Sequence, residues 1–140
     1  MKILLAADGS NYTKRAVSYV VRNLDLLGRE PEIHLLHVRP PLPNRAAAAL
    51  GKTIVRRYHA DETKKALASV KRILGRNRIS FKETQLVGDA GELIAAHAKR
   101  GKFSLIVLGS HGRGTLTNMV LGSVATKVLA CCKVPALIIR

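Results

Sequence analysis

The sequence predicts a single α/β domain in which a parallel β-sheet is covered by helices on both faces. The chain has 140 residues, which is the usual size of one domain. Short apolar runs of strand length alternate along it with longer stretches whose apolar residues recur at helical spacing. Hydrophobic residues make up 47% of the chain and charged residues 24%, a balance that is typical of a folded protein and argues against disorder.

The first three elements are predicted from apolar patterning and turn residues. Lys2–Asp8 is a short apolar run that ends in Asp-Gly-Ser, so it predicts a strand. Asn11–Leu27 carries apolar residues at helical spacing and is followed by Gly28, so it predicts a helix. Glu32–Val38 predicts the second strand.

The middle of the chain predicts a loop, a long helix and a more polar strand. Arg39–Asn44 holds three prolines, which exclude both a helix and a strand interior. A long helix is predicted from Ala49 to Gly75. Ile79–Val87 is the most polar of the predicted strands, so we expect it at an edge of the sheet, with the three apolar strands covered.

The remaining elements complete the alternation of strands and helices. Asp89 and Glu92 have the spacing of a capping box with Asp as the cap, so a helix is predicted from there to Arg100. The last three elements are a strand at Ser104–Gly109, a helix at Gly122–Cys132 and a strand at Val134–Arg140.

No apolar run approaches the ~20 residues of a membrane span. The N-terminal residues read as a strand rather than an export signal, so we expect a cytoplasmic protein. Cys131 and Cys132 are adjacent, which predicts two reduced thiols, and no metal-ligand spacing of Cys and His is present.

The chain is strongly basic, with 24 Lys and Arg against 9 Asp and Glu and a formal net charge of +15. Between Arg45 and Lys82 there are 11 basic and two acidic residues. Along the long helix and just beyond its predicted end, basic residues repeat every seven positions at Arg57, Lys64, Lys71 and Arg78, flanked by Lys65 and Arg72. Two interpretations stay open: an ordinary solvated face, or a docking surface for nucleic acid or another acidic surface. Stacking of single-stranded bases is poorly supported, because only Tyr58 borders the stripe.

The loop from Gly109 to Ser123 is the segment most indicative of a ligand. Several glycines follow a buried strand, and Gly122-Ser123 opens a helix, so backbone N–H groups can point at an oxyanion. The Ser123 hydroxyl, with Arg113 or His111, would complete a phosphate cradle. The alternative is a surface loop with turn glycines. The order GxxGxG does not support a dinucleotide site, and Gly51-Lys52-Thr53 is no P-loop, because Ala46 stands where its first glycine is required.

Three segments give the chain a family resemblance: KILLAADGS at the start, LLHV in the second predicted strand, and GSHGRG…LGS near the end. With these the sequence resembles the universal stress proteins over its whole length. The family's nucleotide signature, Gly-x2-Gly-x9-Gly-Ser, is complete at Gly109, Gly112, Gly122 and Ser123. The resemblance implies the ATP-binding branch and an open five-stranded parallel sheet in the order 3-2-1-4-5, of the adenine nucleotide alpha hydrolase-like type.

The resemblance also implies roles for individual residues. Ala6 and Ala7 would line an adenine pocket, although Ala6 departs from the proline or valine of other members. Asp8 would lie beside the ribose or the metal-phosphate group, Val38 would meet the adenine through its backbone, and Gly88 would edge the pocket. The ribose and phosphates would be held by Gly109, Ser110, His111, Gly112, Arg113, Gly122, Ser123 and Val124.

Together these patterns predict a cytoplasmic, nucleotide-dependent stress-response or signalling module that binds ATP, with Mg²⁺ or Mn²⁺ held through the phosphates. Asp8 is the one acidic residue expected at the site and no acid–base set is evident, so we expect at most slow hydrolysis rather than a dedicated enzyme. The alternative is a protein that binds nucleic acid or an acidic surface through the basic helix Arg57–Arg78. The last strand, an apolar edge, predicts a homodimer centred on Ala136–Ile139, as the resemblance also implies.

Overall fold

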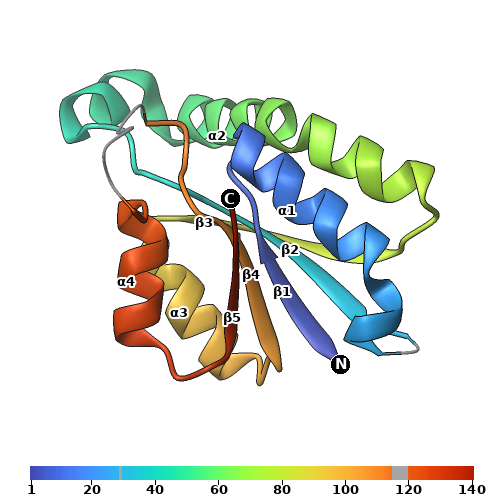
Figure 1. Cartoon of the computed structure of the whole chain (residues 1–140). Helices are drawn as coiled ribbons and strands as arrows, with labels where there is room; N and C mark the ends of the chain where they lie inside the picture. Colours follow the sequence, from blue (N-terminus) through green and yellow to red (C-terminus); the bar gives the residue numbers. More distant parts are fainter. Residues whose placement is uncertain (29, 115–119) are drawn as a thin grey trace.

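The computed structural model describes every residue except 29 and 115–119. Five parallel strands form one sheet in the order β3-β2-β1-β4-β5, which confirms the predicted fold class and strand order (Figure 1). The strands are β1 Lys2–Ala6, β2 Glu32–Arg39, β3 Phe81–Val87, β4 Leu105–Gly109 and β5 Ala136–Ile139. The helices are α1 Asn11–Arg22, α2 Asn44–Arg76, α3 Ala90–Arg100 and α4 Ser123–Cys131, with a short 3-10 turn, η1, at Leu24–Leu27.

The helices form two layers, with α1 and α2 on one face of the sheet and α3 and α4 on the other (Figure 1). Side chains of β1 alternate between the layers. Ile3 and Leu5 pack with the residues buried under α1 and α2, whereas Leu4 and Ala6 pack with those under α3 and α4. Because β1 is covered on both faces, nearly all of its residues are apolar, which is why the sequence marked it as a strand.

Two predicted helix boundaries were wrong. The first helix ends at Arg22 instead of Leu27, because the Asn23 side chain donates to the Tyr19 carbonyl and the chain then tightens into η1. The long helix begins at Asn44 rather than Ala49. Pro43 immediately precedes it, at a position where the missing N–H of proline costs no helical hydrogen bond. The predicted loop Arg39–Asn44 therefore shrinks at both ends, because β2 includes Arg39 and α2 includes Asn44.

Helix α2 is not a continuous rod. Gly51 interrupts it with φ 78° and ψ 159°, a backbone conformation open to glycine. Its buried residues are Thr63, Ala66, Leu67, Val70 and Leu74, all in the second half. The first half extends past the carboxyl edge of the sheet and buries nothing fully, so α2 is anchored to the domain from its C-terminal end (Figure 1).

The two edges of the sheet differ. The polar strand β3 forms one edge, as its composition predicted, and the apolar strand β5 forms the other. The predicted cap of α3 is also confirmed, since Asp89 accepts a 2.9 Å hydrogen bond from the Glu92 N–H. None of the helices that the structure describes has the length and apolar character needed to cross a membrane.

Candidate functional site

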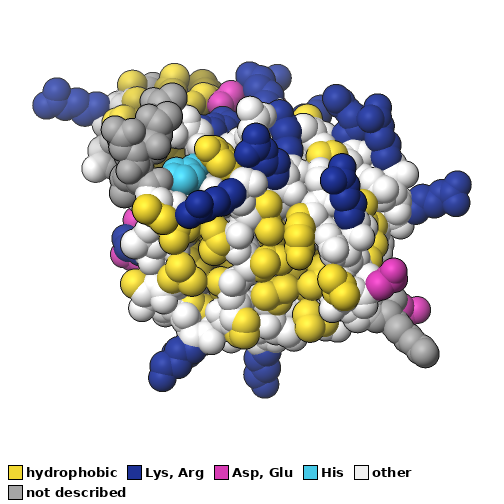
Figure 2. Space-filling model, in the orientation of Figure 1, with side chains coloured by type: hydrophobic (Ala, Val, Ile, Leu, Met, Phe, Trp, Pro, Cys, Tyr) yellow, Lys and Arg dark blue, Asp and Glu magenta, His cyan; other side chains and the backbone are white. Residues whose placement is uncertain are grey.

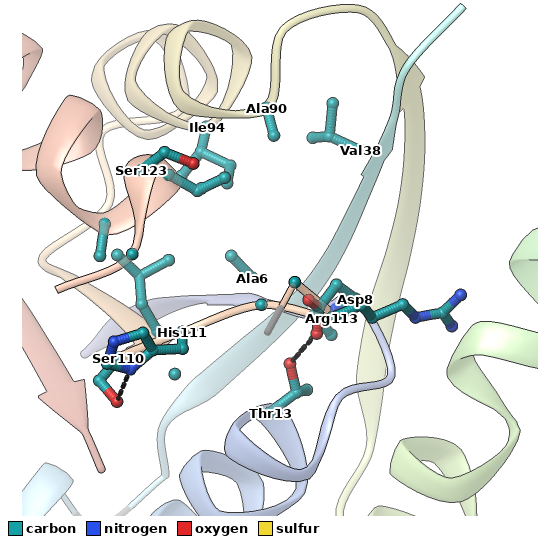
Figure 3. A pocket seen from close by; sticks show the side chains of 18 of the residues that line it. Ala6, Asp8, Thr13, Val38, Ala90, Ile94, Ser110, His111, Arg113 and Ser123 are labelled. Atoms are coloured by element: carbon teal, nitrogen blue, oxygen red, sulfur yellow. Dashed lines mark hydrogen bonds between the residues drawn. The ribbon is translucent and has the colours of Figure 1, made fainter. Parts of the chain in front are cut away.

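A cavity of about 290 Å³ opens at the carboxyl edge of the sheet, between the ends of β1 and β4 (Figure 3). The order in which strands are added to the sheet reverses at this point. From β1 the chain adds β2 and β3 on one side, and it then adds β4 and β5 on the other side of β1. Open α/β sheets bind their ligands at such a switch point. The cavity is therefore where the topology alone would place a ligand.

One side of the cavity is apolar. Ala6 and Leu36 line it from the sheet, and Val38, Ala90 and Ile94 come from the end of β2 and the first turns of α3. The side chains that line it are small or aliphatic, which leaves room for a flat, weakly polar group.

The opposite side carries a fixed carboxylate. Oδ1 of Asp8 accepts a 2.6 Å hydrogen bond from the Thr13 hydroxyl and a 2.9 Å hydrogen bond from the Ser10 N–H. Ser10 is also the cap of α1, accepting from the Thr13 N–H. Since both partners belong to the start of α1, the helix start orients Asp8, and among the described lining residues Asp8 is the only acidic one.

The three glycines of the Gly-x2-Gly-x9-Gly spacing have different physical roles. A Cβ on Gly109 would lie 2.7 Å from Cβ of Tyr12, so this glycine admits α1 rather than a ligand. A Cβ on Gly112 would lie 3.0 Å from Oδ2 of Asp8. A Cβ on Gly122 would lie 3.1 Å from the Ser110 carbonyl oxygen, to which the Gly122 N–H donates at 2.7 Å. The second and third glycines thus bring bare backbone close to the cavity.

Helix α4 directs its N-terminus at the cavity. Gly122 caps it without a side-chain hydrogen bond, while Ser123, Val124 and Ala125 of its first turn line the cavity. The first N–H groups of a helix have no partner inside the helix, and the helix dipole adds a partial positive charge there. This end of the cavity is suited to an anionic oxygen.

Two ion pairs hold α3 and α4 together beside the cavity. Nζ of Lys127 lies 2.9 Å from Oδ2 of Asp89 and 2.9 Å from Oε1 of Glu92. The hydrogen bonds to both carboxylates raise the pKa of Lys127. The hydrogen bond from the Glu92 N–H, followed by that from Lys127, lowers the pKa of Asp89. Because the pairs are exposed, they serve more to align the two helix starts than to stabilise the fold.

Arginine and histidine side chains border the cavity in ways the sequence did not predict. The guanidinium of Arg113 is directed past Asp8 toward α2, away from Ser123 (Figure 3), and its Nη2 lies 2.8 Å from the position of a Cβ on Gly9. The His111 ring is hydrogen-bonded to the Ser110 hydroxyl at 3.0 Å. His37 does not line the cavity. It is buried and bonds through Nδ1 to the Ala7 carbonyl at 2.6 Å, joining the ends of β2 and β1, and burial lowers its pKa.

The structure brings most of the predicted site residues together around one cavity. The lining includes Ala6, Ala7, Asp8, Val38, Gly109, Ser110, His111, Gly112, Arg113, Gly122, Ser123 and Val124. Gly88 does not line it; Ala90, two residues later, does. Residues 115–119 of the predicted loop lie outside the described part of the chain.

Sequence reasoning missed several lining residues, namely Thr13, Leu36, Ala90, Ile94, Leu108, Gly114 and Ala125. Thr13 carried a local signal, since it follows Ser10 at capping distance. Ala90 and Ile94 carried none, because their place at the cavity depends on how α3 packs on the sheet.

The described residues include no group of three or more His, Cys, Asp or Glu that could hold a metal ion. A protein-held metal centre therefore has no support from the described part of the chain, and Asp8 alone offers a carboxylate at the cavity. A cation here would need most of its ligands from another molecule.

Fold and site together define a doubly wound α/β protein with a cavity at its switch point that is lined by glycines and by a helix N-terminus. The family model described as the universal stress protein family matches residues 1–140, and the chain belongs to that family. It is 30% identical over 149 residues to Universal stress protein YxiE of Bacillus subtilis (strain 168), which covers 99% of this chain and 98% of that protein.

Solved structures share the fold. That of hypothetical protein MJ0577 superposes with a TM-score of 0.81 at 26% identity, covering 99% of this chain and 94% of that one. The universal stress protein of Archaeoglobus fulgidus in complex with dAMP superposes with a TM-score of 0.70 at 22% identity, covering 100% of this chain and 98% of that one.

Proposed function

We propose that this protein binds ATP in the cavity between β1 and β4. One observation carries the proposal: an apolar wall, a fixed carboxylate and a glycine-lined helix N-terminus border a single cavity. These three surfaces match in kind the base, the sugar and the phosphates of a nucleotide. Solved structures of the same fold that hold cAMP, dAMP and AMP support an adenine nucleotide.

The expected contacts follow from the cavity lining. The base would lie against Ala6, Val38 and Ile94, where it meets apolar side chains. The ribose hydroxyls would donate to Asp8. The phosphates would accept from the backbone N–H groups at Gly112 and the start of α4, where the bare backbone of Gly112 and Gly122 permits close approach.

A divalent cation, Mg²⁺ or Mn²⁺, would be held mainly through the phosphates, with Asp8 as the nearest protein carboxylate. The ion would offset part of the phosphate charge. Binding of the cation mainly through the phosphates is consistent with the described lining, in which Asp8 is the only acidic residue.

The same lining argues against an efficient enzyme. A hydrolase needs a base that can reach an attacking water. In the described lining, Oδ1 of Asp8 already accepts bonds from Thr13 and Ser10, and the His111 ring is hydrogen-bonded to the Ser110 hydroxyl, while His37 does not line the cavity. We therefore expect slow hydrolysis at most, and a cytoplasmic stress-response or signalling module whose output is conformational, working as a homodimer through β5.

Calorimetric titration with ATP and Mg²⁺ tests the proposal, with inorganic triphosphate and Mg²⁺ as the comparison. ATP should bind more tightly than triphosphate, because the apolar wall contributes only when a base is present. Asp8→Asn should weaken the binding of ATP more than that of triphosphate, because only ATP also loses the bond between its ribose and the carboxylate. Absence of ATP binding by folded wild-type protein, or equal affinity for both ligands, contradicts the assignment.

A further inference from the structure

The basic residues of this protein are concentrated on one layer of the fold. Helices α1 and α2 together carry 12 Lys and Arg and two acidic residues, a net charge of +10. Helices α3 and α4 carry three Lys and Arg and one acidic residue, a net charge of +2. Figure 2 shows Lys and Arg side chains projecting along the side of the molecule where α1 and α2 lie. A general requirement for solubility would not separate the charge in this way.

Most of the Lys and Arg side chains on α2 have no carboxylate partner among the described residues. Among the nine Lys and Arg of α2, the described ion pairs engage only Lys65, with Glu62, and Lys71, with Glu83 of β3. Lys71 therefore faces the sheet edge, and Arg78 lies beyond the helix with φ 56°, so the predicted seven-residue stripe is wrong at these two positions. The cations that remain exposed and unpaired on α2 are Arg45, Lys52, Arg56, Arg57, Lys64, Arg72 and Arg76.

We propose that this basic surface, formed by those seven residues of α2, binds the phosphate backbone of duplex nucleic acid. Unpaired exposed cations release counterions from a polyanion when they bind it, which favours association. The part of α2 after Gly51, residues 52–76, is about 37 Å long. That length is close to one turn of a duplex, about 34 Å. Cations spread along it can therefore meet phosphates over a whole turn.

The structure favours a duplex over a single strand. Single strands are held by aromatic rings on which bases stack. Helix α2 has two aromatic rings, Tyr58 and His59. The guanidinium of Arg39 lies over the Tyr58 ring, 5.1 Å from its centroid. That ring is thus already engaged within the protein.

The structure also favours a duplex over a lipid surface. A helix that binds a membrane inserts an apolar face alongside its cations. Large exposed hydrophobic residues of α2 are confined to Leu50, Ile54 and Tyr58 in its first half, and none lies between Thr63 and Arg76. Lys64, Arg72 and Arg76 therefore have no apolar neighbours that could insert.

The surface is separate from the nucleotide cavity, because none of its residues lines that cavity. It can therefore be tested independently of the proposed ATP site. The probe is a fluorescently labelled, mixed-sequence DNA duplex of about three helical turns, measured by anisotropy from about 50 to 200 mM salt. The test variant is Arg57→Glu/Lys64→Glu/Arg72→Glu, with the corresponding Gln substitutions as a milder second variant. The matched control is Lys99→Glu/Arg100→Glu/Lys133→Glu, which changes the net charge equally on the opposite layer.

The wild type should bind the duplex with an affinity that falls steeply with salt. The Glu variant should bind at least about tenfold more weakly at low salt and lose about 2–3 from the log–log salt slope, since each phosphate contact contributes about 0.9. The Gln variant should lie between, and the control should stay near wild type. A second DNA sequence and an RNA duplex should compete equally.

Three results would overturn the proposal. The first is no duplex binding by folded wild type at low salt. The second is equal weakening by the two Glu variants, which would reduce the effect to net charge. The third is binding to vesicles of phosphatidylserine and phosphatidylcholine without binding to the duplex, which would assign the surface to lipid.

Discussion

The hydroxyl of Thr13 donates a 2.6 Å hydrogen bond to Oδ1 of Asp8, so the first turn of α1 orients the one carboxylate found in the described lining of the cavity. Thr13→Val preserves the shape of this buried side chain and removes the donor. We expect a loss of about 1–2 kcal/mol in the free energy of unfolding, measured by urea denaturation. ATP affinity, measured by calorimetry, should fall several-fold because Oδ1 of Asp8 then keeps only the bond from the Ser10 N–H. Thr13→Ser should retain both properties. Wild-type ATP affinity in the Thr13→Val protein would exclude a role for the Thr13 hydroxyl in ATP binding and leave the Ser10 N–H as the group that holds Asp8.

Gly122→Val should block ATP binding. A Cβ at this position already lies 3.1 Å from Cα of His111 and from the Ser110 oxygen, so valine would displace the loop backbone that borders the cavity. We expect at least about a tenfold loss of affinity by calorimetry, which corresponds to about 1.4 kcal/mol. Gly75→Val is the matched control, because nothing lies within 4 Å of a Cβ there and the residue is on α2. Unchanged ATP affinity in folded Gly122→Val protein would contradict the assignment of the ATP site to this cavity.

Stability should decrease as the pH falls below about 6.5, in part through His37. Burial lowers the pKa of His37 in the folded protein below its ordinary value of 6.5, so the unfolded chain binds more protons as the pH falls through that value. The contribution of His37 is therefore fully present above pH 6.5 and is lost as the pH falls toward its folded pKa. Burial lowers the pKa of His97 in the same direction. Denaturant unfolding between pH 8 and about pH 5 should show a flatter profile for His37→Gln than for wild type. Identical profiles would exclude His37 as a source of the dependence.

Light scattering should give a mass of about twice 15.2 kDa at micromolar concentration, because β5 is an apolar edge. Figure 2 shows hydrophobic side chains gathered on the face where β5 lies. The Pro135 and Ile139 carbonyls accept bonds from β4, so in a parallel ladder the N–H of Ile138 points away from β4. Ile138→Pro should therefore weaken the dimer and spare the sheet. A wild-type mass near 15 kDa would exclude this dimer.

The fold was predictable because burial on both faces leaves a clear pattern in the sequence. Strands such as β1 are continuous apolar runs, and the cap at Asp89 depends only on residues three positions apart. The start of α2 was missed because three prolines mask the point at which helix formation becomes possible. The prediction that Lys71 belongs to an outward-facing stripe of basic residues was wrong, because Glu83 of β3, distant in sequence, pairs with it in the folded chain.

The site was predictable where it rests on local chain geometry and was missed where it rests on packing. The glycine spacing identified the loop and the start of α4, and Asp8 followed directly from β1. Ala90 and Ile94 were missed because α3 reaches the cavity only through the tertiary arrangement. The role of Gly109, which is to let α1 pack closely at Tyr12, could not be predicted either, because this contact joins residues far apart in the sequence.

Because α2 buries residues only in its second half and is interrupted at Gly51, its two halves should report different opening energies. Amide protons near Leu67 and Val70 can exchange with deuterated solvent only when packing against the sheet is lost. Those before His59 need only a local fraying of the helix end. A protease added to the native protein will therefore cut first within the stretch that extends past the sheet, and the remaining domain will keep its core.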